Sequence, residues 1–327
     1  MKRWDRFRDD RGLSTLLFAV LLPAILVMQA LTVDVTRTFV ERRELQNAVD
    51  AAALAAASYL PSTNQAVLAR AQAAAVTYAT LNGAQIAESD VTFSTDREAF
   101  DRVHVRAQAE VPFTFARTFG LTFGVVRSQS VAQVGQLGGM RGVLPMAPEA
   151  PAGGFQFGES YCLKLGSNGG GGACSTAIQG NFHALDIDAT GNSSASIYRS
   201  RLTTGSLTTV FADDVRNVVT GNMNGPTNQG LGDRIQSDTR SFSDVIEERE
   251  DGGYRVLDWG SPRIAILPIV QYNTTTATVL GFAVFYIESY SNNGAIVGRF
   301  IDTVVPGGVW APLNGNGYGT HVVRLIQ

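Results

Sequence analysis

Hydrophobic and polar positions divide the first 60 residues into two contrasting parts. The run from Gly12 to Val33 carries no charge, and as a helix its 22 residues extend for about 33 Å, the thickness of the hydrocarbon layer of a membrane. Pro23 within the run predicts a kink and not a break, because membrane helices tolerate proline. The pattern predicts a transmembrane helix over residues 13–33, behind an N-terminal segment at 1–12.

A cleaved signal peptide is the alternative to a permanent anchor. Secretory signals have a shorter apolar core, and no small-residue cleavage site precedes Asp34, so the sequence favours the anchor. The basic residues before the run are Lys2, Arg3, Arg6, Arg8 and Arg11, and those soon after it are Arg37, Arg42 and Arg43. This excess predicts a single-pass protein of the cytoplasmic (inner) membrane, with its N-terminus inside and its C-terminal bulk extracytoplasmic.

The helix is predicted to continue beyond the membrane, because nothing breaks it before Pro61. Apolar residues recur at helical spacing in this segment and would form one face of the helix: Leu45, Ala48, Val49, Ala52 and Ala56. Asp34 and Arg37 are spaced to pair along the exposed side. The run AAALAAA at 51–57 has two interpretations that stay open: a surface for close approach of another helix or a sheet, or a plain helical spacer.

A small α+β module follows, so that 34–137 forms a stem. A second Ala-rich helix is predicted over Gln65–Leu81, ended by Asn82 and Gly83. The segment 103–111 alternates as a half-buried strand, with His104 on its solvated face. Together with the apolar runs 111–115 and 125–134, this segment predicts a small antiparallel sheet against which the two helices pack.

The pattern of residue types changes after a predicted Gly/Pro-rich linker at 138–154. Residues 155–327 carry short runs of β-branched residues separated by turn clusters, which predicts a β-rich extracytoplasmic module, a sandwich or a barrel. Pro268 lies inside one run and predicts an edge strand or a bulge, because proline cannot donate to a ladder. The whole chain is predicted to be α+β: a transmembrane helix continuing into an Ala-rich helix, a helix-plus-antiparallel-sheet module, and a mostly β module.

The cysteines and the charge limit the chemistry. Cys162 and Cys174 would lie in an oxidising compartment, where a disulfide would contribute roughly 3 kcal/mol, and two unpaired thiols are the alternative. Charged residues make up 17% of the chain, the net charge is −3 and no basic stripe occurs, so nucleic-acid binding has little support.

Candidate catalytic groups are few. His183 lies near Asp186 and Asp188, but the chain has no G-x-S-x-G elbow, and both cysteines are expected to pair with each other, which leaves no activated nucleophile. Residues 186–197 resemble a calcium loop except that Ile197 stands at the twelfth place, which favours an ordinary Asp/Gly turn. We expect no catalytic, cofactor-binding or metal site.

The segment RRELQNAVDAAALAAA resembles the N-terminal signature of TadG-like (TadE/TadG-type) Flp pilus-assembly proteins of the bacterial tight-adherence system. The signature residues are Leu45, Gln46, Asn47, Ala48, Asp50, Ala51, Ala52, Ala53 and Leu54. The resemblance implies an envelope protein without enzymatic activity, with pilus-assembly or other envelope proteins as partners.

The sequence departs from two related patterns. TadE-like pseudopilins are cut after a Gly with a Glu five residues beyond, and here Gly12 is followed by Leu17 at that position, so we expect an uncleaved helix. Many TadG-like proteins carry a D-x-S-x-S metal motif, which is absent from this sequence. We therefore expect a non-catalytic, membrane-anchored component of Flp/Tad pilus assembly or surface adhesion. A tethered hydrolase-like enzyme and a minor pilin-like subunit are the alternatives.

Overall fold

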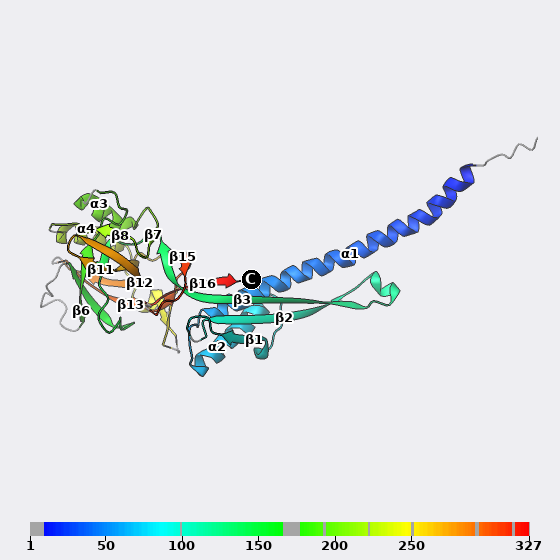
Figure 1. The fold of residues 1–327 in the computed structure, drawn as a ribbon, viewed down its shortest axis with the longest axis horizontal. Coiled ribbons are helices and arrows are strands. Elements are labelled where there is room, and N and C mark those ends of the chain that lie inside the picture. The colour runs from blue at the N-terminus through cyan, green and yellow to red at the C-terminus, as the bar shows by residue number, and fades with distance from the viewer. Residues whose placement is uncertain are drawn as a thin grey trace, which may run out of the picture.

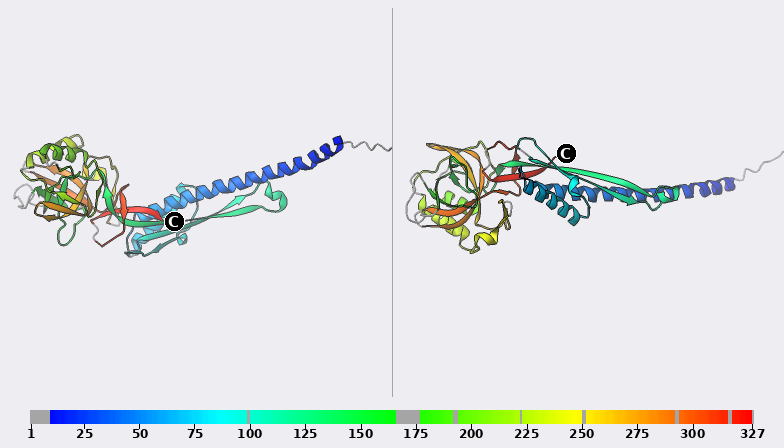
Figure 2. Two further views of the ribbon diagram at one scale, coloured as in Figure 1. Left: turned by 45° about the horizontal axis from the view of Figure 1, so that its top comes forward. Right: turned by 90° about the horizontal axis from the view of Figure 1, so that it is seen from below.

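The computed structural model describes residues 10–98, 100–165, 177–191, 194–221, 223–249, 252–291, 294–315 and 318–326. The molecule is elongated, with a long helix at one end, a narrow stem in the middle and a wider β-rich head at the other end (Figure 1). The two further views in Figure 2 show the same narrow stem and wider head. The predicted α+β class is confirmed.

Helix α1 (Asp10–Ala57) is one continuous helix of 48 residues that passes through Pro23 without a break. Its apolar half is exposed, whereas its C-terminal half is packed against the rest of the stem. This confirms the prediction that the apolar helix continues into the Ala-rich segment. The helix ends before Pro61, as predicted.

Helix α2 (Gln65–Leu81) has the predicted bounds and packs against α1. The side chain of Asn64 caps its start by accepting from the N–H of Ala66 at 2.9 Å. At its other end Asn82 is the C-cap, and Gly83 follows with a φ of +86°, the left-handed conformation that favours glycine.

The stem sheet is ordered β1 (Val91–Ser94), β2 (Arg102–Pro112), β3 (Phe123–Met140), β16 (Thr320–Ile326) and β14 (Thr303–Val304). Strands β1, β2, β3 and β16 pair antiparallel to their neighbours, and the short β14 runs parallel to β16. The predicted alternation is confirmed, because Val103, Val105 and Val111 are buried in one core with α1 and α2.

His104 lies on the face of β2 opposite the buried Val103 and Val105, as predicted, and is half-buried there, with its Nε2 2.7 Å from the hydroxyl of Ser94 on β1. One detail of the predicted sheet was wrong. The strand expected over 111–115 ends at Pro112, because the chain turns into the short 3-10 helix η2 (Ala116–Phe119) at the tip of the β2–β3 hairpin. The hairpin runs beside α1 and points away from the head (Figure 1).

Strand β3 joins the stem to the head. It continues through residues 138–140, the start of the predicted linker, and its second half pairs with β16, β15 (Val309–Ala311) and β7 (Val210–Phe211). Residues 320–326, which the sequence analysis placed in the β-rich module, therefore complete the stem sheet. The domain boundaries themselves stay predictions.

The head sheet is ordered β11 (Ile264–Asn273), β12 (Thr276–Tyr290), β13 (Ala295–Ile301), β5 (Ser160–Leu165), β6 (Ile178–Ala184) and β4 (Met146–Pro148), with β8 (Val215–Asn217) pairing to β12. The N–H of Leu144, just before β4, donates to the carbonyl of Ile266 on β11 at 2.9 Å, so the sheet curls toward a barrel. Pro268 lies on β11, the terminal strand of this order, beside a bulge between Ile269 and Val270, as predicted.

Helices cover part of the head. They are α3 (Ala195–Thr204), α4 (Asn224–Ile235) and α5 (Phe242–Val245), and a hairpin of β9 (Ile246–Glu248) and β10 (Tyr254–Val256) follows. The guanidinium of Arg199 on α3 bonds the carboxylate of Asp233 on α4 at 2.7 Å. Phe182, Phe285 and Phe300 are fully buried in one core with the apolar side chains of α3 and α4. The head is therefore a packed core, closed on one side by α3 and α4.

Candidate anchoring and junction sites

The signature segment of α1 forms the centre of the stem core. Its buried members are Leu45, Ala48, Ala52 and Ala53, together with the neighbouring Val49 and Ala56. Small side chains let α2 and the sheet approach the backbone of α1 closely. Of the two interpretations left open for the Ala-rich run, close packing is the one that the structure supports.

The signature residues outside the core include one that bonds to the stem sheet and two that face solvent. The side-chain amide of Gln46 donates to the carboxylate of Asp50 at 2.9 Å and to the carbonyl of Gln129 on β3 at 3.1 Å, so it ties helix to sheet. Asn47 and Leu54 point outward, and Leu54 is 40% exposed. These two are the signature residues available to a partner.

Asp34 is the first charged residue after the apolar run, and it is buried. One carboxylate oxygen accepts from the N–H of Thr114 at 2.8 Å, and the other accepts from Phe115 and Ala116 at 2.9 and 2.7 Å. Burial alone would raise the pKa of Asp34, but these three donors and the nearby Arg37 outweigh it and hold the pKa below its ordinary value.

The sequence prediction for Asp34 was wrong about its surroundings. Spacing suggested a surface pair with Arg37, whereas the carboxylate is enclosed by the tip of the β2–β3 hairpin. Its partners are backbone N–H groups, which every residue type except proline carries. No residue pattern marks such a contact.

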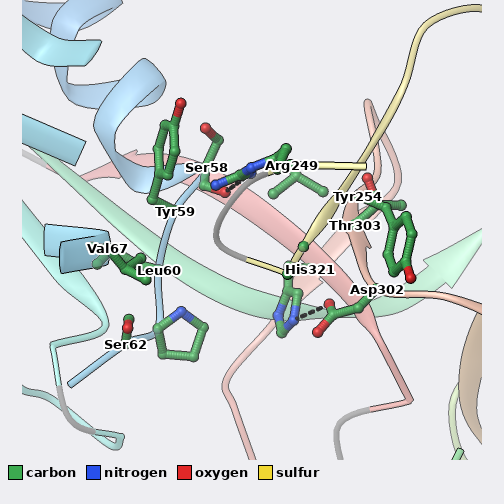
Figure 3. Close-up of a pocket in the computed structure, with 14 residues that line it drawn as sticks. Ser58, Tyr59, Leu60, Ser62, Val67, Arg249, Tyr254, Asp302, Thr303 and His321 are labelled. Carbon is green, nitrogen blue, oxygen red and sulfur yellow. Dashed lines mark hydrogen bonds and ion pairs between the residues drawn. The ribbon is translucent and has the colours of Figure 1, made fainter. Parts of the chain in front are cut away.

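A cavity of about 220 Å³ lies where stem and head meet (Figure 3). Its walls come from the end of α1, the β9–β10 hairpin and β16. The guanidinium of Arg249 lies 3.9 Å from the centre of the Tyr59 ring and donates to the carbonyl of Ser58 at 3.1 Å. Arg249 therefore attaches the head hairpin to the end of the stem helix through a cation–π contact and a hydrogen bond.

The same cavity holds an imidazole–carboxylate pair. The Nε2 of His321 lies 3.0 Å from the carboxylate of Asp302 (Figure 3). The serines in the cavity wall are engaged elsewhere: the Ser58 hydroxyl donates to Ala55 at 2.7 Å, and the Ser62 hydroxyl accepts from the N–H of Asn64 at 3.1 Å. These bonds of the two serine hydroxyls are therefore to the backbone of their own segment and not to His321.

His183, the histidine singled out from the sequence, is on β6. Its ring stacks on Tyr272 with centres 4.0 Å apart and planes 8° apart. Burial lowers the pKa of His183, with the carboxylate of Glu149 opposing this in part. The imidazole thus packs against Tyr272 on the face of β6 opposite the buried Phe182 and Ala184.

Asp186 and Asp188 do not join His183 in one site. Asp186 accepts from the N–H of Gly191 at 2.8 Å and from Thr190, which is the ordinary Asp/Gly turn favoured over a calcium loop. Asp188 pairs with Arg201 and accepts from the N–H of Leu207 at 2.8 Å. A cavity beside these two aspartates measures about 10 Å³ and does not include His183.

Cys162 is the cysteine of the predicted disulfide that lies within the described residues. Cys162 is buried on β5, opposite Val297 of β13. Cys174 lies outside the described residues, so the Cys162–Cys174 disulfide stays a prediction.

The fold defines an α+β protein with one long N-terminal helix whose first half is apolar and exposed. Among the described residues, α1 is the one helix long and apolar enough to cross a bilayer. Residues 12–58 match a family model described as putative Flp pilus-assembly TadE/G-like. The resemblance found in the sequence is thereby confirmed for this segment. No curated protein and no solved structure matches the chain.

Proposed function

We propose that this chain is a non-catalytic, membrane-anchored structural component of Flp/Tad-type pilus assembly or surface adhesion. In this role α1 crosses the cytoplasmic membrane with its N-terminus inside, and the stem and head stand on the outer side. The proposal rests above all on α1: one unbroken helix, apolar and exposed along its first half, buried in the stem core along its second half, and matched to the pilus-assembly family.

Continuity of α1 gives the proposal its physical basis. A helix embedded in lipid at one end and in a protein core at the other transmits position without a flexible linker, because every backbone group is bonded within the helix. The head would then be held at a fixed height above the membrane. Partners would meet the head, or the exposed Asn47 and Leu54 of the signature.

A non-catalytic role agrees with the polar groups of the head. His183 stacks on Tyr272, Asp186 accepts hydrogen bonds from its own loop, and Asp188 pairs with Arg201 and accepts from the N–H of Leu207. In the described part of the chain no three His, Cys, Asp or Glu side chains gather to hold a metal. A substitution of His183 by alanine is expected to leave pilus assembly unchanged.

Topology and fractionation test the anchor. Full-length protein should remain in the membrane pellet after alkaline carbonate washing, and a C-terminal reporter should be active only outside the cytoplasm. Release by carbonate, or a cytoplasmic reporter signal, would contradict the proposal. Mass spectrometry of the mature N-terminus distinguishes the anchor from a processed pilin-like subunit. Crosslinks from residues 138–327, mapped after co-purification, would identify the partners.

A further inference from the structure

The tip of the β2–β3 hairpin carries an unusual group of exposed apolar side chains. Phe119 is 66% exposed, Leu121 59% and Phe123 50%, and Phe115 beside them is also exposed. Four large exposed apolar residues thus lie within nine positions at one hairpin tip, a patch of a kind that soluble surfaces rarely leave facing water.

The contact with Asp34 determines where this patch lies. Because Asp34 directly follows the apolar run and binds three backbone groups of the tip, the patch is held beside the outer end of that run. A groove of about 670 Å³ separates the two elements, lined by Leu31 and Phe39 from α1 and by Leu121 from the hairpin, among others. Leu31 belongs to the uncharged run itself, so the tip reaches its last turns.

We infer that the tip of the β2–β3 hairpin inserts into the outer interface of the same lipid bilayer that α1 crosses. Phe119 and Leu121 lie at the boundary between headgroups and acyl chains, and lipid fills the groove between hairpin and helix. The inference rests on the proposed anchor, because lipid is the occupant that is continuous with the apolar surface of α1. Amphipathic and aromatic elements favour this interfacial depth.

Charges around the patch fit a lipid surface. Arg117 on η2 and Arg127 on β3 are exposed, and Arg127 lines the groove with Arg42 of α1. Guanidinium groups bind phosphate oxygens in a bidentate manner, so these arginines suit phospholipid headgroups above an apolar layer. A second attachment would restrict the tilt of α1 and thereby fix the direction in which the stem leaves the membrane.

Fluorescence quenching by lipid tests the depth of the tip. The full-length chain is reconstituted into phosphatidylglycerol/phosphatidylcholine vesicles with brominated acyl chains, and the emission of the three native tryptophans is subtracted. Three variants are compared: Phe119→Trp at the tip, Val20→Trp within the apolar run, and Leu81→Trp at the end of α2. All three positions are exposed, and α2 lies beside the C-terminal half of α1, away from the tip (Figure 1).

The inference requires quenching of the added emission for Val20→Trp and Phe119→Trp, and unquenched emission for Leu81→Trp. Unquenched Phe119→Trp beside quenched Val20→Trp would overturn the inference, leave the anchor standing and indicate a protein occupant for the patch. Unquenched Val20→Trp would overturn the proposed anchor itself. Equal quenching of Leu81→Trp would also overturn the inference, because it would show lipid contact along the whole stem.

Discussion

The carboxylate of Asp34 accepts a hydrogen bond of 2.7 Å from the backbone N–H of Ala116, 82 residues further along the chain. This contact joins the point where α1 leaves its apolar run to the tip of the longest hairpin of the stem. Thr114 and Phe115 donate to the same carboxylate, so one buried side chain holds three consecutive backbone groups.

Replacing Asp34 by asparagine should release the hairpin tip. Asparagine keeps one acceptor oxygen but presents an NH₂ donor to backbone N–H groups, which leaves donors facing donors. Hydrogen–deuterium exchange of the amides of residues 114–116 should become faster in Asp34→Asn, while amides within β2 stay protected. The exposed Glu44→Gln on the same helix is the control and should change nothing. Unchanged exchange in Asp34→Asn would show that the carboxylate does not hold the tip.

Acid should weaken the same contact. The folded-state pKa of Asp34 lies below its ordinary value of 3.8, so its stabilisation is complete above that value and is lost as the pH falls through the folded pKa. Spin labels on the exposed Thr36 of α1 and Thr118 of the tip should report a longer or broader distance once the pH is lowered beneath that ordinary value, and no change between pH 5 and 8. Asp34→Asn should remove this pH dependence, and a transition that persists in that variant would assign it to another group.

Overpacking of the stem core should destabilise the protein. Ala75 on α2 is fully buried in the core shared with α1 and the sheet, so Ala75→Leu should lower the free energy of unfolding by about 1–3 kcal/mol. Ala73, two residues away on the same helix, is exposed, and Ala73→Leu is the matched control. Denaturant titration of the full chain in detergent micelles measures both. Equal effects would contradict close packing as the role of the small side chains.

Gly135 on β3 should not tolerate a side chain. A Cβ at this position would lie 2.3 Å from the carbonyl oxygen of Ala311 and 2.3 Å from the indole nitrogen of Trp310, both on β15. Gly135→Ala should displace β15 and lower the free energy of unfolding by about 1–3 kcal/mol, with faster amide exchange at residues 309–311. A Cβ at Gly153 would meet nothing within 4 Å, so Gly153→Ala should be nearly neutral.

Arg249 should stiffen the joint between head and stem. Arg249→Met keeps an apolar side chain of similar length but removes the charge over the Tyr59 ring and the donor to Ser58, at a cost of about 1 kcal/mol. Distances between spin labels on the exposed Thr77 of α2 and Ser200 of α3 should become more broadly distributed. Arg255→Met, on the neighbouring strand and with an exposed ion pair to Glu247, is the control. An unchanged distance distribution in Arg249→Met would show that the strands joining stem and head set the angle between them without Arg249.

Local patterns predicted the helices well. The continuous α1 and the bounds of Gln65–Leu81 follow from apolar periodicity, caps and the position of Pro61, all of which lie within a few residues of the element that they define. Pro268 on a terminal strand is of the same kind, since a missing N–H is a local property. The members of the candidate site at His183 are also close in the sequence, but the structure gives them separate partners from other parts of the chain: His183 stacks on Tyr272, and Asp188 pairs with Arg201.

By itself the sequence determined the apolar run, the helical stem with its buried alanine face, and the β-rich character of the second half, because hydrophobic periodicity reports which face of an element is buried. Only the tertiary structure decided that the C-terminal strand 320–326 returns to pair with β3, that Asp34 binds the hairpin tip, and that Arg249 meets Tyr59. These contacts join residues far apart in the chain, and two of them use backbone groups that almost every residue carries. Residue spacing and composition therefore do not predict them.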